Sequence, residues 1–279
     1  MKMRRRTLPE GWYPSSDAEI RALLSEWKTA APPQAALAAV APHAGWYFSG
    51  SVAAKSQLSL APADTVAVIG GHLPADYPVL YGAEDAFETP CGPLESDTAL
   101  MEKVLARLLG GKIPFKEDEY VDNSVEVQLP LLKAIFPDAG LLWLRAPASA
   151  AAGQALGSAL AGAAEELGRS LVCLASTDLT HYGPDYDFMP KGRGPAAEKW
   201  ARSESDQGFI DALLAMDAEK AVELGRAGAA CSSGAAAAAV AFARLKGAGK
   251  AVLNAHSMSL DIRPAPSFVG YCSISYYRT

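Results

Sequence analysis

Short buried strands that are followed by a histidine recur along this 279-residue chain, and this recurrence constrains its fold more than any other feature. The apolar runs lie at residues 36–40, 65–69 and 171–175. Continuous apolar runs of this length are typical of strands buried on both faces of a parallel sheet. His43 and His72 follow the first two runs within three residues, and His181 follows the third. Because parallel strands share one C-terminal edge, where open α/β sheets bind ligands, we expect the three imidazoles to converge there.

Helical patterns separate the predicted strands. Residues 151–167 have such a pattern and lie between strand runs at 141–144 and 171–175. These segments predict a βαβ unit with a right-handed, parallel connection. Other predicted elements are helices at 17–29, 97–109 and 235–246, a hairpin formed by 79–81 and 86–88, and strands at 251–256 and 269–276. No long linker divides the chain, so the sequence predicts one α/β domain that spans residues 1–279.

Charge and hydropathy exclude several classes of partner. The 31 acidic residues outnumber the 25 basic ones, for a net charge of −6, and the basic segment Lys2–Arg6 is short. Nucleic acid and anionic membranes are therefore poor partners. The alanine-rich run Gly234–Ala243 is much shorter than the roughly 20 residues that cross a bilayer. Because no apolar signal-peptide segment follows Arg6, we expect a cytoplasmic protein with a solvated N-terminal tail.

The cysteines and histidines together predict a metal site built from distant segments. The four cysteines are far apart and form no CxxC pair, which argues against a zinc ribbon or a disulfide framework. Two neutral imidazoles and one anionic ligand are typical of a catalytic mononuclear metal centre. Cys231 is the best third ligand, because it lies at or just before a predicted helix N-terminus, which favours the thiolate. The alternative is that Cys231 is a small buried hydrophobic residue, as we expect for Cys91, Cys173 and Cys272.

Asp178 and His181 predict a second function for the same sheet edge. They are three residues apart in one turn, so the carboxylate can orient the imidazole and His181 can act as a general acid or base. Alternatively, Asp178 caps the following helix. Asn123 and Glu126 could supply hydrogen bonds around the site, although a helix that Asn123 caps explains that residue equally well. We expect His256, late in a strand, to be structural.

The motifs resemble those of the Memo family, also called AmmeMemoRadiSam system protein B. They are Gly11–Pro14, Pro42–Gly50 (PHAGWYFSG), Gly70–His72, Ser124–Pro130 (with EVQLP), Ser176–Gly183 (SxDxxHYG), and Cys231 before a helix. Their order is specific, and the resemblance covers nearly the whole chain. Members of that family usually carry His where Asn123 stands. Asn can form hydrogen bonds there but cannot exchange a proton near neutral pH.

The resemblance implies a fold and a chemistry. It implies a three-layer αβα sandwich with a mostly parallel central sheet, similar to class III extradiol dioxygenases of the LigB type. His43, His72 and Cys231 match the metal-binding positions of the family, and His181 matches an additional acid/base histidine, here supported by Asp178. The implied cofactor is a divalent transition metal, iron first, with copper or zinc as alternatives. A thiolate in place of a carboxylate makes the site softer, so ring cleavage does not follow.

Two functions from different classes fit these observations. The first is a metal-dependent oxidoreductase or dioxygenase-like enzyme whose substrate is unknown. The second is a non-catalytic module that binds a peptide or small ligand on the same scaffold, with the aromatic residues Trp46, Tyr47 and Phe48 lining the groove. Metal-assisted hydrolysis, a third function, would require a zinc-activated water. The partner is therefore expected to be a small molecule or a peptide, and the motifs do not specify an oligomeric state.

Overall fold

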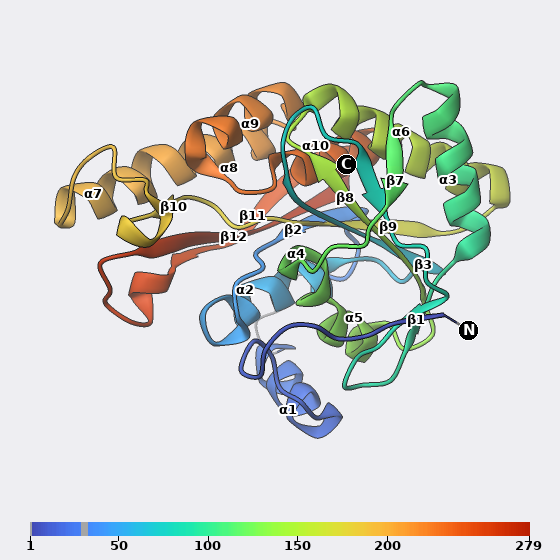
Figure 1. The fold of residues 1–279 in the computed structure, drawn as a ribbon, viewed down its shortest axis with the longest axis horizontal. Helices are drawn as coiled ribbons and strands as arrows, with labels where there is room; N and C mark the ends of the chain where they lie inside the picture. Colours follow the sequence, from blue (N-terminus) through green and yellow to red (C-terminus); the bar gives the residue numbers. More distant parts are fainter. Residues whose placement is uncertain (1, 29–32) are drawn as a thin grey trace.

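A mixed sheet forms the centre of the computed structural model, which describes residues 2–28 and 33–279 (Figure 1). Among these residues the main sheet has nine strands in the order β10-β12-β2-β9-β3-β8-β4-β7, with β11 paired to β12. Their bounds are β2 Ala38–Ala41, β3 Thr65–Leu73, β4 Val79–Tyr81, β7 Phe115–Glu117, β8 Gly140–Pro147, β9 Leu171–Ser176, β10 His181–Tyr182, β11 Ala248–Met258 and β12 Phe268–Arg278.

The centre of this sheet is parallel and its flanks are largely antiparallel. β2, β9, β3 and β8 are parallel neighbours, whereas β12 runs antiparallel to β2, and β4 runs antiparallel to β8. The predicted α/β fold is confirmed, but the sheet is mixed rather than mostly parallel. β11 and β12 explain much of the difference, because they pair with each other directly and antiparallel neighbours need no helical crossover.

Helices cover both faces of the sheet (Figure 1). Alternating residues of β2 enter two separate cores: Ala38 and Val40 pack with α3, α6 and α10, whereas Ala39 and Ala41 pack with residues of α2, α4 and α5. This alternation follows from the two-residue period of a strand. The bounds are α1 Asp17–Trp27, α2 Trp46–Ser59, α3 Thr98–Gly110, α4 Asn123–Glu126, α5 Leu129–Ile135, α6 Ala150–Leu167, α7 Pro195–Trp200, α8 Gln207–Leu214, α9 Ala218–Leu224 and α10 Ser233–Leu245.

The described secondary structure also includes four short 3₁₀ and π segments. They are η2 Pro184–Tyr186, η3 Ala201–Asp206, η4 Gly225–Ala229 and η5 Ser259–Asp261. The helix predicted at 17–29 is α1, and residue 29 lies outside the described residues. Ser16 caps α1 by accepting a hydrogen bond from the backbone N–H of Glu19. Among the helices that the structure describes, none is long and apolar enough to cross a membrane.

Two predictions about the first hundred residues are wrong. β4 does not form a hairpin with β5 (Ala86–Phe87), because β4 joins the main sheet and β5 pairs with β1 (Met3–Arg4) and β6 (Leu94–Glu95). The basic N-terminal segment is therefore not a solvated tail. Its Arg4 guanidinium donates hydrogen bonds to the carbonyls of Asp118 and Tyr120, and the segment forms the edge of a small three-stranded sheet.

Candidate metal centre

Three neighbouring strands bring the expected site residues to one edge of the sheet. The order β2-β9-β3 places His43 just after β2, Asp178 just after β9, and His72 near the end of β3. Cys231 approaches the same point from the segment before α10. One potential ligand atom from each of His43, His72 and Cys231 lies within 4.8 Å of the others. The Cys231 Sγ atom is 3.1 Å from His43 Nε2.

Hydrogen bonds on every side hold His43, which is only 1% exposed. Its Nδ1 lies 3.1 Å from Ser176 Oγ, and that hydroxyl accepts a hydrogen bond of 2.9 Å from Gln128. The backbone N–H of His43 donates to Asp178 Oδ1 at 2.6 Å, and Asn123 donates to the His43 carbonyl at 3.0 Å. These contacts direct Nε2 towards Cys231. Asn123 thus supplies the hydrogen bond near the site that the sequence suggested.

A bulge in the backbone presents His72. The pairing of β3 with β8 shifts between Gly70 and Leu73, and His72 has a left-handed φ of 58°. Non-glycine residues rarely adopt this conformation, although histidine does so more often than most. A Cβ atom on Gly71 would lie only 2.8 Å from Ser232 Cα, so glycine allows the start of α10 to approach the bulge. The Gly-Gly-His motif therefore serves to bring His72 and the Cys231 segment together.

Asp122 is a contact of the site that the sequence analysis missed. Its Oδ2 lies 2.8 Å from His72 Nδ1, while its Oδ1 accepts the Ser124 N–H at 2.9 Å and caps α4. The sequence signal was an acidic residue before a predicted helix start, and such a residue is ordinarily a helix cap. The same carboxylate thus caps α4 and contacts His72, so the alternative that Asn123 caps the helix is wrong.

His72 and Cys231 each shift the pKa of the other towards the charged form. Loss of solvent contact alone raises the pKa of the Cys231 thiol, but His43 and His72 outweigh it and hold this pKa well below its ordinary value. Burial alone lowers the pKa of His72, but Asp122 and Cys231 more than offset this effect and raise the pKa of His72 to about 10. Both shifts favour the thiolate form of Cys231, which is the form that binds metal.

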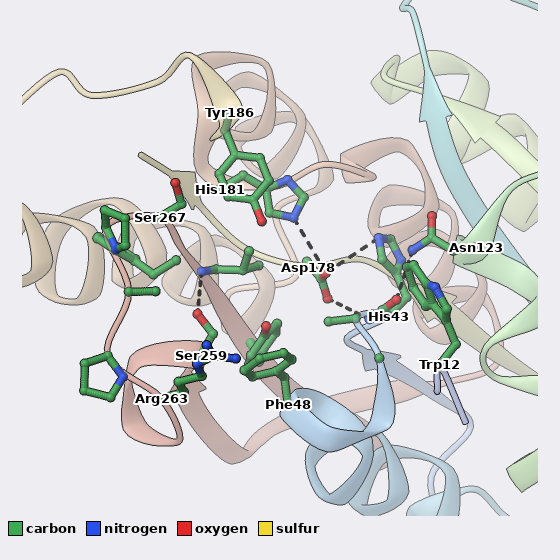
Figure 2. Close-up of a pocket in the computed structure, with 18 of the residues that line it drawn as sticks. Trp12, His43, Phe48, Asn123, Asp178, His181, Tyr186, Ser259, Arg263 and Ser267 are labelled. Carbon is green, nitrogen blue, oxygen red and sulfur yellow. Dashed lines mark hydrogen bonds and ion pairs between the residues drawn. The ribbon is translucent and has the colours of Figure 1, made fainter. Parts of the chain in front are cut away.

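Asp178 lies between the rings of His43 and His181, as Figure 2 shows. Its Oδ2 is 3.6 Å from His181 Nε2 and 4.0 Å from His43 Nε2. Burial raises the pKa of Asp178, but His43 and His181 outweigh this effect, so the pKa of Asp178 is lowered. For His181 the signs are reversed: burial lowers its pKa, but Asp178 and Cys231 outweigh this effect, so the pKa of His181 is raised. The chain continues from Asp178 to β10, so the alternative that Asp178 caps a helix is wrong.

A cavity of about 520 Å³ opens beside these groups (Figure 2). Its polar wall includes His43, His72, Asn123, Asp178 and His181. Its apolar and aromatic wall includes Trp12, Phe48, Tyr186, Phe268, Val269 and Tyr271. The Tyr186 ring stacks on the His181 ring, with centroids 4.8 Å apart and planes 16° apart. The cavity therefore combines titratable groups with flat apolar surfaces.

The expected aromatic lining is only partly correct. Phe48 lines the cavity, but Trp46 is buried and donates to the Val127 carbonyl, and Tyr47 is 66% exposed. The helical period explains this result, because consecutive residues at the start of α2 point in different directions. Trp12 was missed as a lining residue. Its sequence signal is the Gly11–Pro14 stretch, which belongs to the motifs that resemble the Memo family.

Two other polar residues have roles outside the cavity. Glu126 accepts hydrogen bonds from the backbone N–H groups of Thr7 and Leu8 and from the Tyr13 hydroxyl, and so holds the N-terminal segment in place. His256 contacts Asp206 at 3.2 Å, in agreement with a structural role. Cys91, Cys173 and Cys272 are free thiols outside the His43, His72 and Cys231 group.

Comparisons with known proteins agree with these motifs. A family model described as Memo-like protein matches residues 4–275. A MEMO1 family protein of Archaeoglobus fulgidus is 31% identical over 284 residues, which cover 98% of this chain and 99% of that protein. A MEMO1 family protein of Pyrococcus abyssi is 30% identical, with 85% of each chain covered.

A solved structure supports the fold independently of close sequence similarity. The uncharacterized protein JW3007 from Escherichia coli K12 has a TM-score of 0.51 and 15% identity, with 85% of this chain and 98% of that chain covered. At this identity the likeness concerns the fold alone. The match of the family model and the full-length relatives establish that this chain belongs to the Memo-like protein family.

Proposed function

We propose that this protein binds one divalent transition metal, iron first and copper or zinc as alternatives, through His43, His72 and Cys231. The observation that carries the proposal is the convergence of two imidazoles and a thiolate from three distant segments within 4.8 Å. Metal–nitrogen and metal–sulfur bonds of about 2.0–2.3 Å are compatible with ligand atoms at this separation. Imidazole and thiolate donors suit iron, copper and zinc, so the residues fit such an ion.

The chemistry we propose is that of an oxidoreductase with a dioxygenase-like architecture, a three-layer αβα sandwich similar to the class III extradiol dioxygenases. The metal, when bound, would supply redox or Lewis-acid chemistry. His181, whose ring lines the cavity, would exchange a proton with the substrate through Nδ1, and Asp178 would orient the ring through its contact of 3.6 Å with Nε2. The aromatic wall would orient the substrate and exclude water from it.

Metal analysis of protein purified without a histidine tag tests this proposal. We expect close to one equivalent of metal in the wild type and its loss in the His43→Ala/His72→Ala double variant. His256→Ala is the matched control, because His256 contacts Asp206 rather than the cluster. A substoichiometric metal content that is unchanged in the double variant would refute the proposal.

The cavity also favours a second candidate, a non-catalytic module that binds a small molecule or a peptide. Its volume of about 520 Å³ and its aromatic wall are suited to a ligand of that size. This candidate predicts that ligand affinity survives both metal removal and Cys231→Ser. If affinity falls with the metal, the enzyme proposal is favoured instead.

A further inference from the structure

Arg145 is a buried cation that lies beneath the bulge of β3. It stands on β8, directly opposite Gly70, and is 4% exposed. Its Nε and Nη2 atoms bind the two carboxylate oxygens of Asp118 at 2.7 and 3.0 Å. This bidentate pair already gives the guanidinium a full counter-charge. The remaining nitrogen, Nη1, contacts other groups.

Arg145 Nη1 connects the ion pair to His72. It lies 3.0 Å from Asp122 Oδ2 and donates a hydrogen bond of 3.3 Å to the Gly71 carbonyl. Asp122 Oδ2 in turn lies 2.8 Å from His72 Nδ1. Arg145 therefore contacts both the backbone just before His72 and the carboxylate that holds the His72 ring.

The geometry decides which ring nitrogen of His72 faces the cluster. Asp122 Oδ1 is fixed by the N-terminus of α4, so Oδ2 has little freedom to move. When the carboxylate accepts a hydrogen bond from Nδ1–H, Nε2 is the ring nitrogen that can bind a metal. The left-handed backbone of His72 needs support from its surroundings, and the bond to the Gly71 carbonyl supplies it.

We propose that Asp122 is a positioning residue, which fixes the ring of His72 so that Nε2 is presented to His43 and Cys231. This inference rests on the proposed metal site and names a residue that orients one of its ligands. The competing explanation is that Arg145 and both carboxylates only stabilise the fold.

The decisive comparison is between Asp122→Asn and Asp118→Asn. Both variants remove one carboxylate from Arg145, but only Asp122 contacts His72. The amide of Asp122→Asn can donate to Nδ1 and so favours the ring form whose proton is on Nε2. We expect Co²⁺ affinity to fall about 10- to 100-fold in Asp122→Asn, a typical effect of losing such a partner. Asp118→Asn should retain wild-type affinity within about three-fold.

A measurement on metal-free protein provides a second readout. The proton on His72 Nδ1, shielded by Asp122, should give a low-field NMR resonance in the wild type and in Asp118→Asn. It should be absent from Asp122→Asn and from the assignment control His72→Gln. This readout does not depend on metal binding, so it tests the positioning of His72 even if the wild type binds no Co²⁺, a result that would refute the proposed function instead.

Equal loss of Co²⁺ affinity in both variants would overturn the inference and favour a purely structural network. Unchanged affinity in Asp122→Asn, or persistence of the low-field resonance in that variant, would also overturn it. Urea unfolding of each variant verifies that both carry a folded chain.

Discussion

Cys231 and Asp178, two of the acidic side chains that contact the histidines of this site, have different roles. The Cys231 sulfur lies 3.1 Å from His43 Nε2 and belongs to the group of three potential ligands. The Asp178 carboxylate lies 3.6 Å from His181 Nε2 and also holds the backbone N–H of His43. We infer that the Cys231 thiolate binds the metal and that the Asp178 carboxylate orients His181 for proton exchange.

Asp178→Asn should lower the pKa of His181. Burial on its own lowers that pKa, and Asp178 contributes the strongest of the contacts that raise it. An NMR titration of the His181 ring in metal-free protein measures the change. The resonances of His256, which contacts Asp206, serve as an internal control. A His181 pKa that is equal in the wild type and the variant would contradict the assigned pairing.

The raised pKa of His181 also contributes to the pH dependence of stability. Because the pKa of His181 is raised on folding, its contribution is complete below the unfolded pKa of about 6.5 and is lost as the pH rises through the folded pKa. Asp178, whose pKa is lowered, contributes above its unfolded pKa and loses that contribution in acid. In metal-free protein, Asp178→Asn should flatten the dependence of the free energy of unfolding on pH in both ranges, which urea unfolding at a series of pH values measures. A pH profile equal to that of the wild type would contradict the assigned pairing of Asp178 with His181.

At the scale of elements, the end of β3 is the point where two helices meet the sheet. A side chain on Gly70 would overlap Ser124 at the start of α4, and one on Gly71 would overlap Ser232 before α10. The close contact between strand and helices therefore depends on these two glycines. It also sets the distance from His72 to Cys231, since Cys231 adjoins Ser232.

Gly71→Ala should destabilise the protein and weaken metal binding together. The added methyl group meets backbone as well as side-chain atoms of Ser232, so the start of α10 must move. We expect a loss of about 1–3 kcal/mol in the free energy of unfolding, which urea titration measures. Gly110→Ala is the matched control, because nothing lies within 4 Å of a Cβ at that position. Wild-type stability and metal affinity in Gly71→Ala would contradict the close approach.

The sequence predicted the parts of the site that depend on sheet geometry. His43 and His72 follow apolar runs that become the parallel strands β2 and β3, so their convergence could be predicted from the C-terminal edge that parallel strands share. Asp122 and Arg145 could not be assigned, because one looks like a helix cap and the other is a charged residue inside a strand. Their roles depend on the bulge in β3, which has no local sequence signal beyond two glycines.

At the scale of the whole molecule, the N-terminal segment closes one side of the cavity. Thr7, Leu8 and Tyr13 are bound to the buried carboxylate of Glu126, and Trp12, within this segment, lines the cavity. The sequence showed the EVQLP motif but not this partner, because contacts between residues over a hundred positions apart leave no periodic pattern.

Glu126→Gln should loosen the N-terminal segment. The amide keeps the shape but loses the charge that strengthens its bonds to Thr7, Leu8 and Tyr13. We expect a destabilisation of about 1–3 kcal/mol and faster proteolytic cleavage near Trp12. Glu102→Gln, on the exposed side of α3, is the control for a change of charge alone. Cleavage at the wild-type rate would show that Glu126 does not anchor the segment.

The central claim is that one metal ion binds between His43, His72 and Cys231. A crystal structure with anomalous scattering recorded at the iron, copper and zinc edges tests it most directly. We predict a single strong peak about 2.0–2.3 Å from one nitrogen of each histidine and from the sulfur. The absence of a peak in metal-supplemented protein, or a peak bound only by other residues, would contradict it.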